Sequence, residues 1–254
     1  MINATLLKAA LIAGWFALMA TLERVRPAAP RPAPHRLARI VHNGAFWAQG
    51  ALINPLLTAP ISLWAASAAL WERPEALTGI GGLIFDLIIL DLWIYIWHRL
   101  NHVTPILWRF HETHHLDEFL DTTSAVRFHP GELILSAGAR TAIILLAAIP
   151  ISSVLVFETL VLASTIFHHS NLRLPGELER ALRLFIVTPS HHWVHHHARR
   201  ADTDSNYATI LTIWDRVFGT LSSTARTPDM PIGVQGTSER RLAALMARPF
   251  RRAI

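Results

Sequence analysis

Of the 254 residues, 52% are hydrophobic and 16% are charged. Soluble domains carry about 25% charged residues, so this composition favours a membrane protein over an ordinary soluble one. The net charge of +5 comes from arginine, with Lys8 the only lysine. These arginines flank apolar stretches, where they suit anionic lipid headgroups better than nucleic acid, and the absence of cysteine excludes disulfides and thiolate ligands.

The first predicted element is an apolar stretch at residues 4–22, about the length needed to span a bilayer. A secretory signal is disfavoured, because the following segment, 23–42, is rich in arginine, which is the wrong polarity for such a signal. The same segment is rich in proline and is predicted to be an irregular connector.

Two further apolar runs follow the connector. The run at about 45–71 contains Pro55 and Pro60, which predict a kink in this helix. The run at 80–97 is predicted to be another membrane helix, and it ends at the first of three histidine sets.

Residues 132–149 and 151–167 are two more apolar runs, joined at Pro150. Together they predict a helical hairpin that enters the bilayer and returns. Arg140, inside the first run, would be costly if it faced lipid and is therefore expected to face protein. The chain is thus predicted to be an all-α integral membrane protein with about four membrane-spanning or hairpin-forming helical units.

The placement of arginine predicts the topology. Segment 23–42 has five arginines and the tail after 168 has twelve, whereas the short loop at 72–79 has one. Positive residues concentrate on the cytoplasmic side, so 23–42, 98–131 and 168–254 are predicted to be cytoplasmic, with the N-terminus outside. The expected location is a bacterial inner membrane.

Thirteen of the fifteen histidines lie between His98 and His197. The segment HRLNH has histidines at i and i+4, and HETHH and HHWVHH each have them at i, i+3 and i+4, which places each set on one helical face. Neutral imidazole is a good ligand for iron, zinc and copper. The eight histidines of these sets are His98, His102, His111, His114, His115, His192, His195 and His196. Eight exceed the four ligands that a zinc ion takes, which predicts two metal ions.

The ordered set HxxxH, HxxHH and a later HxxHH resembles the membrane fatty acid hydroxylase and sterol desaturase superfamily. The resemblance extends to DLWIYIWHRLNH, LWRFHETHH, RFHPGE, FHHSN, TPSHHWVHH and NYATILTIWDRVFGT, and it covers about residues 91–220. Residues 1–90 and 221–254 carry none of these elements.

The resemblance implies a histidine-rich cap on the cytoplasmic face that holds two non-haem iron ions. Such enzymes use O2, and two electrons from a partner, to attack an unactivated C–H bond of a lipid-like substrate. His169, in the FHHSN element, becomes a ninth candidate ligand beside the eight histidines of the three sets. No fused redox domain is evident, so a ferredoxin, a cytochrome b5 or a reductase is the expected electron donor.

Other residues are expected to support the site rather than to bind the metal. Asp91 is predicted to orient a ligand or to bond Tyr95, and His129 and Asn206 are predicted to lie just outside the ligands. Glu112 is expected to pair with a nearby arginine such as Arg109. Five tryptophans favour an interfacial aromatic belt over a substrate tunnel, namely Trp93, Trp97, Trp108, Trp193 and Trp214.

The predicted organisation has three parts: membrane helices and connector at 1–79, the catalytic domain at 80–220, and a basic tail at 221–254. The main alternative function is a zinc metalloprotease, because HETHH also fits HExxH with Glu112 as general base. That alternative leaves the other histidine sets unexplained, and a metal transporter would place its ligands near the membrane midplane instead. Hydroxylation is favoured over desaturation. The substrate stays open among fatty acyl chains, sterols or hopanoids, carotenoids and other amphiphiles.

Overall fold

The computed structural model describes residues 2–31, 36–238 and 241–251, and within them the chain is helical with only isolated β-bridges. The long helices are α1 (Ile2–Val25), α2 (Arg36–Ile53), α4 (Gly79–Val103), α6 (Pro130–Leu146) and α7 (Ile151–His169). The shorter ones are η1 (Asn54–Thr58), α3 (Ala59–Ser67), η2 (Glu75–Leu77), α5 (Pro105–His115), η3 (Thr122–Val126), α8 (Gly176–Leu182), α9 (Pro189–His195), α10 (Arg200–Thr203), α11 (Ile213–Val217), α12 (Leu242–Ala247) and η4 (Arg248–Phe250). The predicted all-α class is confirmed.

Three of the described helices are long and apolar enough to cross a membrane: residues Leu6–Val25 of α1, all of α4 and all of α7. Their outward-facing side chains include many large hydrophobic residues that water would not tolerate in such number. This agrees with the predicted membrane protein. The helix α4 continues past the predicted end at 97 and carries the whole HxxxH set within its last turns.

The second apolar run stays helical through both of its prolines. Pro55 lies in the first turn of the π-helix η1, and Pro60 lies in the first turn of α3. Both prolines nevertheless lie inside one continuous helix, because Ile53 and Thr58 also have right-handed helical backbone. A proline inside a helix removes an N–H donor and crowds the carbonyl of the preceding turn. The kink predicted from the sequence is thus accommodated by one widened turn between α2 and α3.

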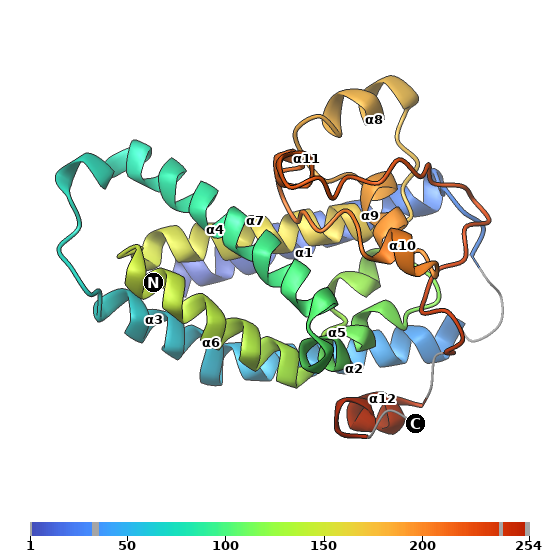
Figure 1. The fold of residues 1–254 in the computed structure, drawn as a ribbon, viewed down its shortest axis with the longest axis horizontal. Coiled ribbons are helices and arrows are strands. Elements are labelled where there is room, and N and C mark those ends of the chain that lie inside the picture. Colours follow the sequence, from blue (N-terminus) through green and yellow to red (C-terminus); the bar gives the residue numbers. More distant parts are fainter. Residues whose placement is uncertain (1, 32–35, 239–240, 252–254) are drawn as a thin grey trace.

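The helices α6 and α7 are joined by a short turn and lie antiparallel to each other (Figure 1). Arg140 on α6 forms an ion pair with Glu158 on α7, with 3.0 Å between Nη2 and Oε1. The expectation that Arg140 faces protein is confirmed. Apolar packing at the turn end of the hairpin buries Leu90 of α4 together with Ile144 and Val154.

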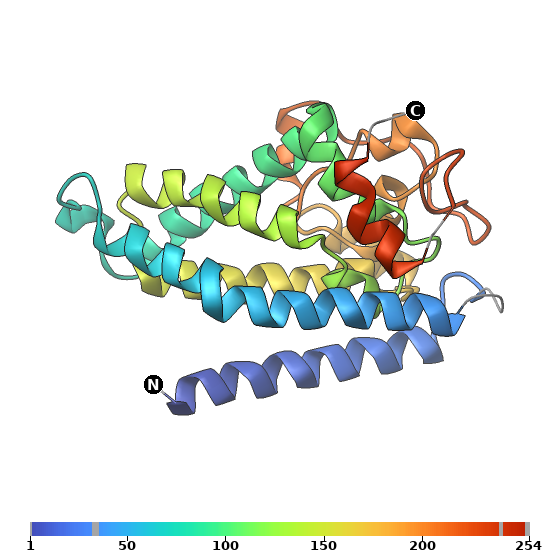
Figure 2. The same ribbon diagram turned by 90° about the horizontal axis from the view of Figure 1, so that it is seen from below.

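The long helices run lengthwise through the molecule, and the short helices α8 to α11 gather where α4 and α7 end (Figure 1). This arrangement forms a cap in which the three histidine sets meet. The chain after the cap returns to α5, where η4 packs against it, and Figure 2 shows α12 in red on the outside of the bundle.

At the opposite end of the bundle, a buried carboxylate ties α4 to its neighbours. Asp86 accepts hydrogen bonds from Arg73 at 2.7 Å and from Ser153 at 2.6 Å. These contacts explain a charged residue inside an apolar helix without any role at the histidine sets, which lie more than two helical turns further along α4.

Candidate metal centre

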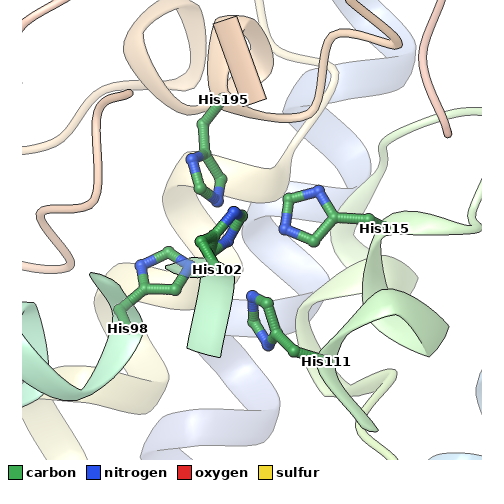
Figure 3. A group of neighbouring side chains, drawn as sticks. All are labelled: His98, His102, His111, His115 and His195. Atoms are coloured by element: carbon green, nitrogen blue, oxygen red, sulfur yellow. The ribbon is translucent and has the colours of Figure 1, made fainter. Parts of the chain in front are cut away.

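Five imidazoles from α4, α5 and α9 point toward one common centre (Figure 3). Their candidate ligand nitrogens all lie within 4.8 Å of one another. The members of this five-histidine group are His98, His102, His111, His115 and His195. The i, i+4 spacing on α4 and on α5 gives each helix two rings on the same face, and α9 contributes the fifth ring from the other side.

A second set of four imidazoles lies beside the first. Its candidate nitrogens also lie within 4.8 Å of one another, and all four side chains are buried. This four-histidine group consists of His114 from α5, His169 from the end of α7, and His192 and His196 from α9 and its C-terminal cap. The nine histidines singled out in the sequence therefore separate into sets of five and four, which matches two metal ions rather than one.

The geometry of the four-histidine group fits a bound cation. The Nε2 atoms of His114 and His169 lie 3.0 Å apart, while their Nδ1–H groups donate to the carbonyl oxygens of Arg127 at 3.1 Å and Thr165 at 2.9 Å. A neutral imidazole with its proton on Nδ1 has a lone pair on Nε2. Two lone pairs at this distance repel unless a cation lies between them.

The remaining contacts of this group have similar lengths. The Nε2 of His192 lies 3.0 Å from that of His169 and 3.1 Å from that of His196. Two nitrogens that each lie about 2.1 Å from one metal ion are about 3.0 to 3.4 Å apart. The spacing is thus that of ligands sharing one ion.

The five-histidine group contains buried nitrogens that lack partners. Within the described part of the chain, the Nε2 atoms of His102, His111, His115 and His195 accept and donate no hydrogen bond. A buried polar atom without a partner costs roughly 1–3 kcal/mol. Four of them around one centre are the donor set that a metal ion would satisfy, and the absence of sulfur and carboxylate ligands suits a metal that accepts imidazole, such as iron.

Five of the cap histidines are held in the neutral form that metal binding requires. Burial, and then the positive charge that neighbouring imidazoles would carry, holds the pKa of each well below 6.5. The histidines concerned are His114, His115, His192, His195 and His196. At neutral pH their lone pairs are free for a metal.

Outer contacts orient the rings of the five-histidine group. The Nδ1 of His111 lies 2.6 Å from a carboxylate oxygen of Glu132, and His98 and His195 donate from Nδ1 to backbone carbonyls of Tyr207 and Ser205, both at 2.7 Å. Such contacts fix the tautomer and direct Nε2 inward. Sequence analysis missed Glu132, although its place in the RFHPGE element was a signal that could have drawn attention to it.

Asp91 has a different partner from the one predicted. Its Oδ2 accepts from the indole N–H of Trp214 at 2.8 Å and from the backbone N–H of Leu211 at 3.2 Å. Tyr95 instead exchanges a hydrogen bond with Thr220 at 2.9 Å. Asp91 therefore anchors the segment after the third histidine set to α4, and it touches neither Tyr95 nor a histidine through these bonds.

His129 and Asn206 support the backbone near the site. His129 caps α6, accepting from the N–H of Gly131 at 3.0 Å. Asn206 adopts a left-handed backbone with φ of 53° and donates from its side chain to the carbonyl of His191 at 3.0 Å. The left-handed backbone conformation favours asparagine, because the asparagine side chain can form a local hydrogen bond. Asn206 thus shapes the turn that follows α9 and its cap.

The histidines that flank the third set have carboxylate partners of their own. His191 lies 3.0 Å from Asp215, which also accepts from the backbone N–H of Tyr207 at 2.8 Å. His197 lies 2.7 Å from Asp202. Both flanking histidines stand outside the two groups.

The aromatic belt expected from the sequence does not describe all five tryptophans. Trp193 is only 1% exposed, and Arg226 lies over its ring at 3.8 Å. Trp108 packs against the ring of His102 at 5.0 Å, and Trp97 lines a cavity. Trp193 therefore lies in the interior of the cap, whereas Trp97 and Trp108 are half-buried beside the cavity and the histidines.

Glu112 pairs with the C-terminal segment rather than with Arg109. Arg248 of η4 donates to both of its carboxylate oxygens, at 2.5 and 2.7 Å. Glu112 thus faces η4 and belongs to neither histidine group, so it is not placed as a base beside either of them.

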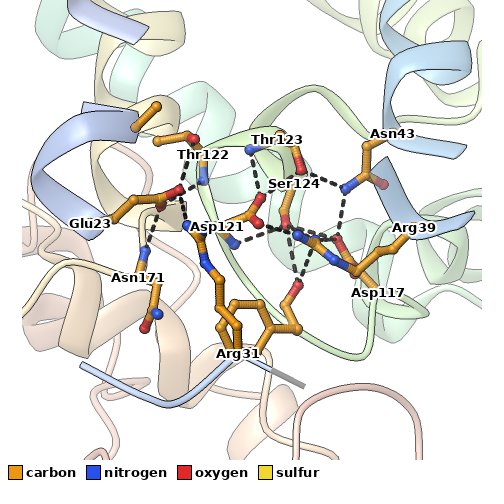
Figure 4. Close-up of polar contacts among 12 residues, drawn as sticks. Glu23, Arg31, Arg39, Asn43, Asp117, Asp121, Thr122, Thr123, Ser124 and Asn171 are labelled. Carbon is orange, nitrogen blue, oxygen red and sulfur yellow. Dashed lines mark hydrogen bonds and ion pairs between the residues drawn. The ribbon is translucent and has the colours of Figure 1, made fainter. Parts of the chain in front are cut away.

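A buried polar network holds the segment that follows the second histidine set (Figure 4). Arg39 of α2 donates to Asp117 at 2.8 Å and also pairs with Asp121. Glu23 at the end of α1 accepts backbone N–H bonds from the start of η3 and from Asn171, each at 3.0 Å. The network joins three helix ends around the four-histidine group.

One cavity, partly open to the outside, connects both groups with the membrane part of the bundle. Its volume is about 450 Å³, and its wall includes histidines of both groups, apolar residues of α4, α6 and α7, and the charged residues Lys8, Arg140 and Glu158. Volumes of 300–1,000 Å³ are typical of small-molecule sites. A long apolar ligand could therefore reach both groups from within the membrane part.

Comparison with known proteins adds an independent finding. The sequence profile of the fatty acid hydroxylase family matches residues 83–220. The chain is 29% identical to an ornithine lipid hydroxylase of Rhizobium tropici over 170 residues, which is 66% of this chain and 50% of that protein. It is 37% identical to an alkylglycerol monooxygenase of Danio rerio over 133 residues, 52% of this chain and 28% of that protein.

A third relative is the cholesterol 25-hydroxylase of Homo sapiens, 29% identical over 179 residues, which cover 68% of this chain and 62% of that protein. The chain thus spans about half or less of the length of the first two relatives and somewhat under two thirds of the third. No solved structure matches it significantly.

Proposed function

The chain belongs to the fatty acid hydroxylase family, and from this premise we propose that it is a membrane-bound di-iron oxygenase that hydroxylates a C–H bond of a lipid-like substrate. The observation that carries the proposal is the cavity whose wall includes histidines of both groups and apolar residues of the membrane helices. A hydrocarbon chain in that cavity would end beside both groups.

The proposed ligands follow the two groups. One iron ion would be held by His98, His102, His111, His115 and His195, and the other by His114, His169, His192 and His196. Two iron ions, when bound, supply the O2-activating power that an unactivated C–H bond requires. The chain's own residues aim these rings inward, and they bury all of them except the half-buried His98.

The cavity wall gives the substrate its orientation. Its apolar part favours a hydrocarbon segment, because burial of apolar surface is favourable by about 25 cal/mol per Å². Holding that segment against the groups limits which carbon lies within reach. The position of the substrate carbon relative to the two groups decides between hydroxylation and desaturation. The relatives are named as hydroxylases and monooxygenases, which favours hydroxylation.

The other expectations become parts of this proposal. Residues 80–220 form the catalytic unit, with 1–79 and 221–254 serving the membrane and the outer surface of the cap. The histidine groups face the cytoplasm of a bacterial cell, and a separate ferredoxin, cytochrome b5 or reductase delivers electrons there. The arginine-rich cap surface suits an acidic partner. The zinc protease alternative gains no support, since Glu112 is engaged by Arg248.

Two measurements test the proposal. The purified protein should contain two iron ions per chain and convert a lipid to a product heavier by one oxygen, with ¹⁸O2 as the source of that oxygen. Zinc as the bound metal, or peptide hydrolysis without lipid oxidation, would refute it. For the topology, a reporter fused after Thr220 should be active in the cytoplasm, and activity only in the periplasm would contradict the assigned side.

A further inference from the structure

The cavity has a charged end that the metal ligands do not use. Arg140 and Glu158 form an ion pair on its wall, with each side chain 19% exposed. Both sit in apolar segments, where charged residues are expensive and commonly mark a substrate or ion pathway. The pair needs an explanation beyond packing.

This end is separated from the histidines by a substantial distance. Arg140 follows Glu132, the partner of His111, by eight residues on α6, which corresponds to about 12 Å along the helix. Glu158 precedes His169 by eleven residues on α7, or about 16 Å. The cavity therefore has a metal-facing end and a charged end about 12 to 16 Å apart.

Lys8 lies near the same charged end. The indole N–H of Trp15 on α1 donates to the carbonyl of Ala163 on α7 at 2.9 Å, which aligns the two helices. Lys8 precedes Trp15 by seven residues, and Glu158 precedes Ala163 by five, so both lie roughly 8 to 10 Å back along their helices. Lys8 is also part of the cavity wall.

The polar groups at this end include donors that the protein does not use. The Nε of Arg140 is buried without a partner, and Lys8 has no ion-pair partner among the residues that the structure describes. Two cations face one carboxylate, which leaves an excess positive charge. A ligand group that accepts hydrogen bonds and carries negative charge would satisfy both the donors and the charge.

From this juxtaposition we infer that Arg140, assisted by Lys8 and held in place by Glu158, binds the anionic end group of an elongated amphiphile, a carboxylate or a phosphate. The hydrocarbon segment of that amphiphile then runs along the cavity to the histidines. The carbon that is oxidised lies about 12 to 16 Å from the anionic group. This inference rests on the proposed function and adds the substrate's charge and the position of its reaction.

The test measures binding with four ligands that share one hydrocarbon chain: dodecanoate, dodecyl phosphate, dodecanol and dodecyltrimethylammonium. The full-length protein is placed in phosphatidylcholine nanodiscs, and each ligand competes with a diazirine-labelled dodecanoate whose cross-linked peptides are identified by mass spectrometry. The wild type should bind dodecanoate or dodecyl phosphate more tightly than the other two ligands. Whichever of these two ligands binds more tightly shows whether the site prefers a carboxylate or a phosphate.

Variants separate charge recognition from folding. Arg140→Gln should weaken binding of the preferred anion by about tenfold or more and leave dodecanol binding unchanged. Glu158→Gln should strengthen it severalfold, because it removes a competing negative charge. The double variant Arg140→Gln/Glu158→Gln keeps a matched neutral pair and controls for stability, and Arg180→Gln breaks an exposed ion pair on α8 as a matched control.

Equal binding of all four ligands, or an equal loss of dodecanol and dodecanoate binding in Arg140→Gln, overturns the inference. Binding is measured without turnover, so its outcome is independent of the oxygenase assay. A protein that binds the anion through Arg140 but oxidises no lipid would refute the proposed function alone. A protein that oxidises lipids without regard to Arg140 would refute this inference alone.

Discussion

At the scale of single residues, the chemistry of the site depends on which nitrogen of each ring carries the proton. The Nδ1 atoms of His98 and His195 face backbone carbonyl oxygens, and that of His111 faces the carboxylate of Glu132. These contacts leave the Nε2 lone pairs directed toward the centre of the group. The loss of one such ring removes one ligand nitrogen and should therefore lower the metal content, while the other rings keep their orientation.

His195→Ala should lower the iron content and abolish lipid oxidation, because it removes the one ring that α9 contributes to the five-histidine group. His197→Ala is a matched control from the same sequence segment, since His197 is paired with Asp202 outside both groups. Its iron content should stay at the wild-type value. Iron analysis and product assay of both variants check this, and full iron in the His195 variant would remove it from the ligand set.

Glu112→Gln distinguishes a general base from a surface contact. The Glu112 side chain is only 12% exposed, and glutamine keeps one acceptor oxygen for the guanidinium, so the substitution should cost about 1–3 kcal/mol of unfolding free energy. Iron content and lipid oxidation should be nearly unchanged, because the carboxylate faces η4 and belongs to neither histidine group. A general base would contribute about 10²–10⁴-fold to the rate, so a loss of that size in the assay would contradict this placement.

At the scale of elements, the network around Arg39 fixes the segment that follows the second histidine set. Arg39 is buried and forms ion pairs with both Asp117 and Asp121. Its guanidinium joins the start of α2 to the segment between the second histidine set and η3. The position of His114 at the end of α5 thus depends on a residue that is 75 positions earlier in the sequence.

Arg39→Gln should destabilise the protein by about 3–5 kcal/mol, because it leaves two buried carboxylates without their cation. A shift of this size is measurable in the thermal unfolding of the detergent-solubilised protein. Arg180→Gln, which breaks an exposed pair on α8, should leave the midpoint almost unchanged. Equal midpoints for the two variants would show that the network does not stabilise the fold.

At the scale of the whole molecule, the burial of so many neutral histidines makes stability depend on pH. Five cap histidines have a pKa well below 6.5 in the folded protein. In the unfolded chain they bind protons as the pH falls through about 6.5, while the folded chain does not. The unfolded state then holds more protons, so the free energy of unfolding decreases as the pH falls below this value.

The metal-free protein should therefore lose up to about 1.4 kcal/mol of unfolding free energy per pH unit for each such histidine below pH 6.5. Thermal midpoints between pH 8 and pH 5 provide the measurement, with little change expected above pH 7. Bound iron should be released over the same acidic range, because protons compete for the ligand nitrogens. A midpoint that does not vary between pH 7 and pH 5 would contradict the buried neutral state.

The sequence alone was sufficient for the features that arise from local spacing. Apolar runs of bilayer length predict the membrane helices, and histidines at i, i+3 and i+4 must share a helical face whatever surrounds them. The ordered histidine sets therefore indicated the family and eight candidate ligands, and the FHHSN element added His169 as the ninth.

Only the tertiary structure decided how those ligands are divided. His114 and His115 are neighbours in sequence, yet their rings join different groups, because one faces α7 and the other faces α4. The contacts of Glu132 with His111 and of Arg248 with Glu112, like the charged end of the cavity, join residues on separate helices. Spacing along one helix cannot predict such contacts, since they depend on how separate helices pack against one another.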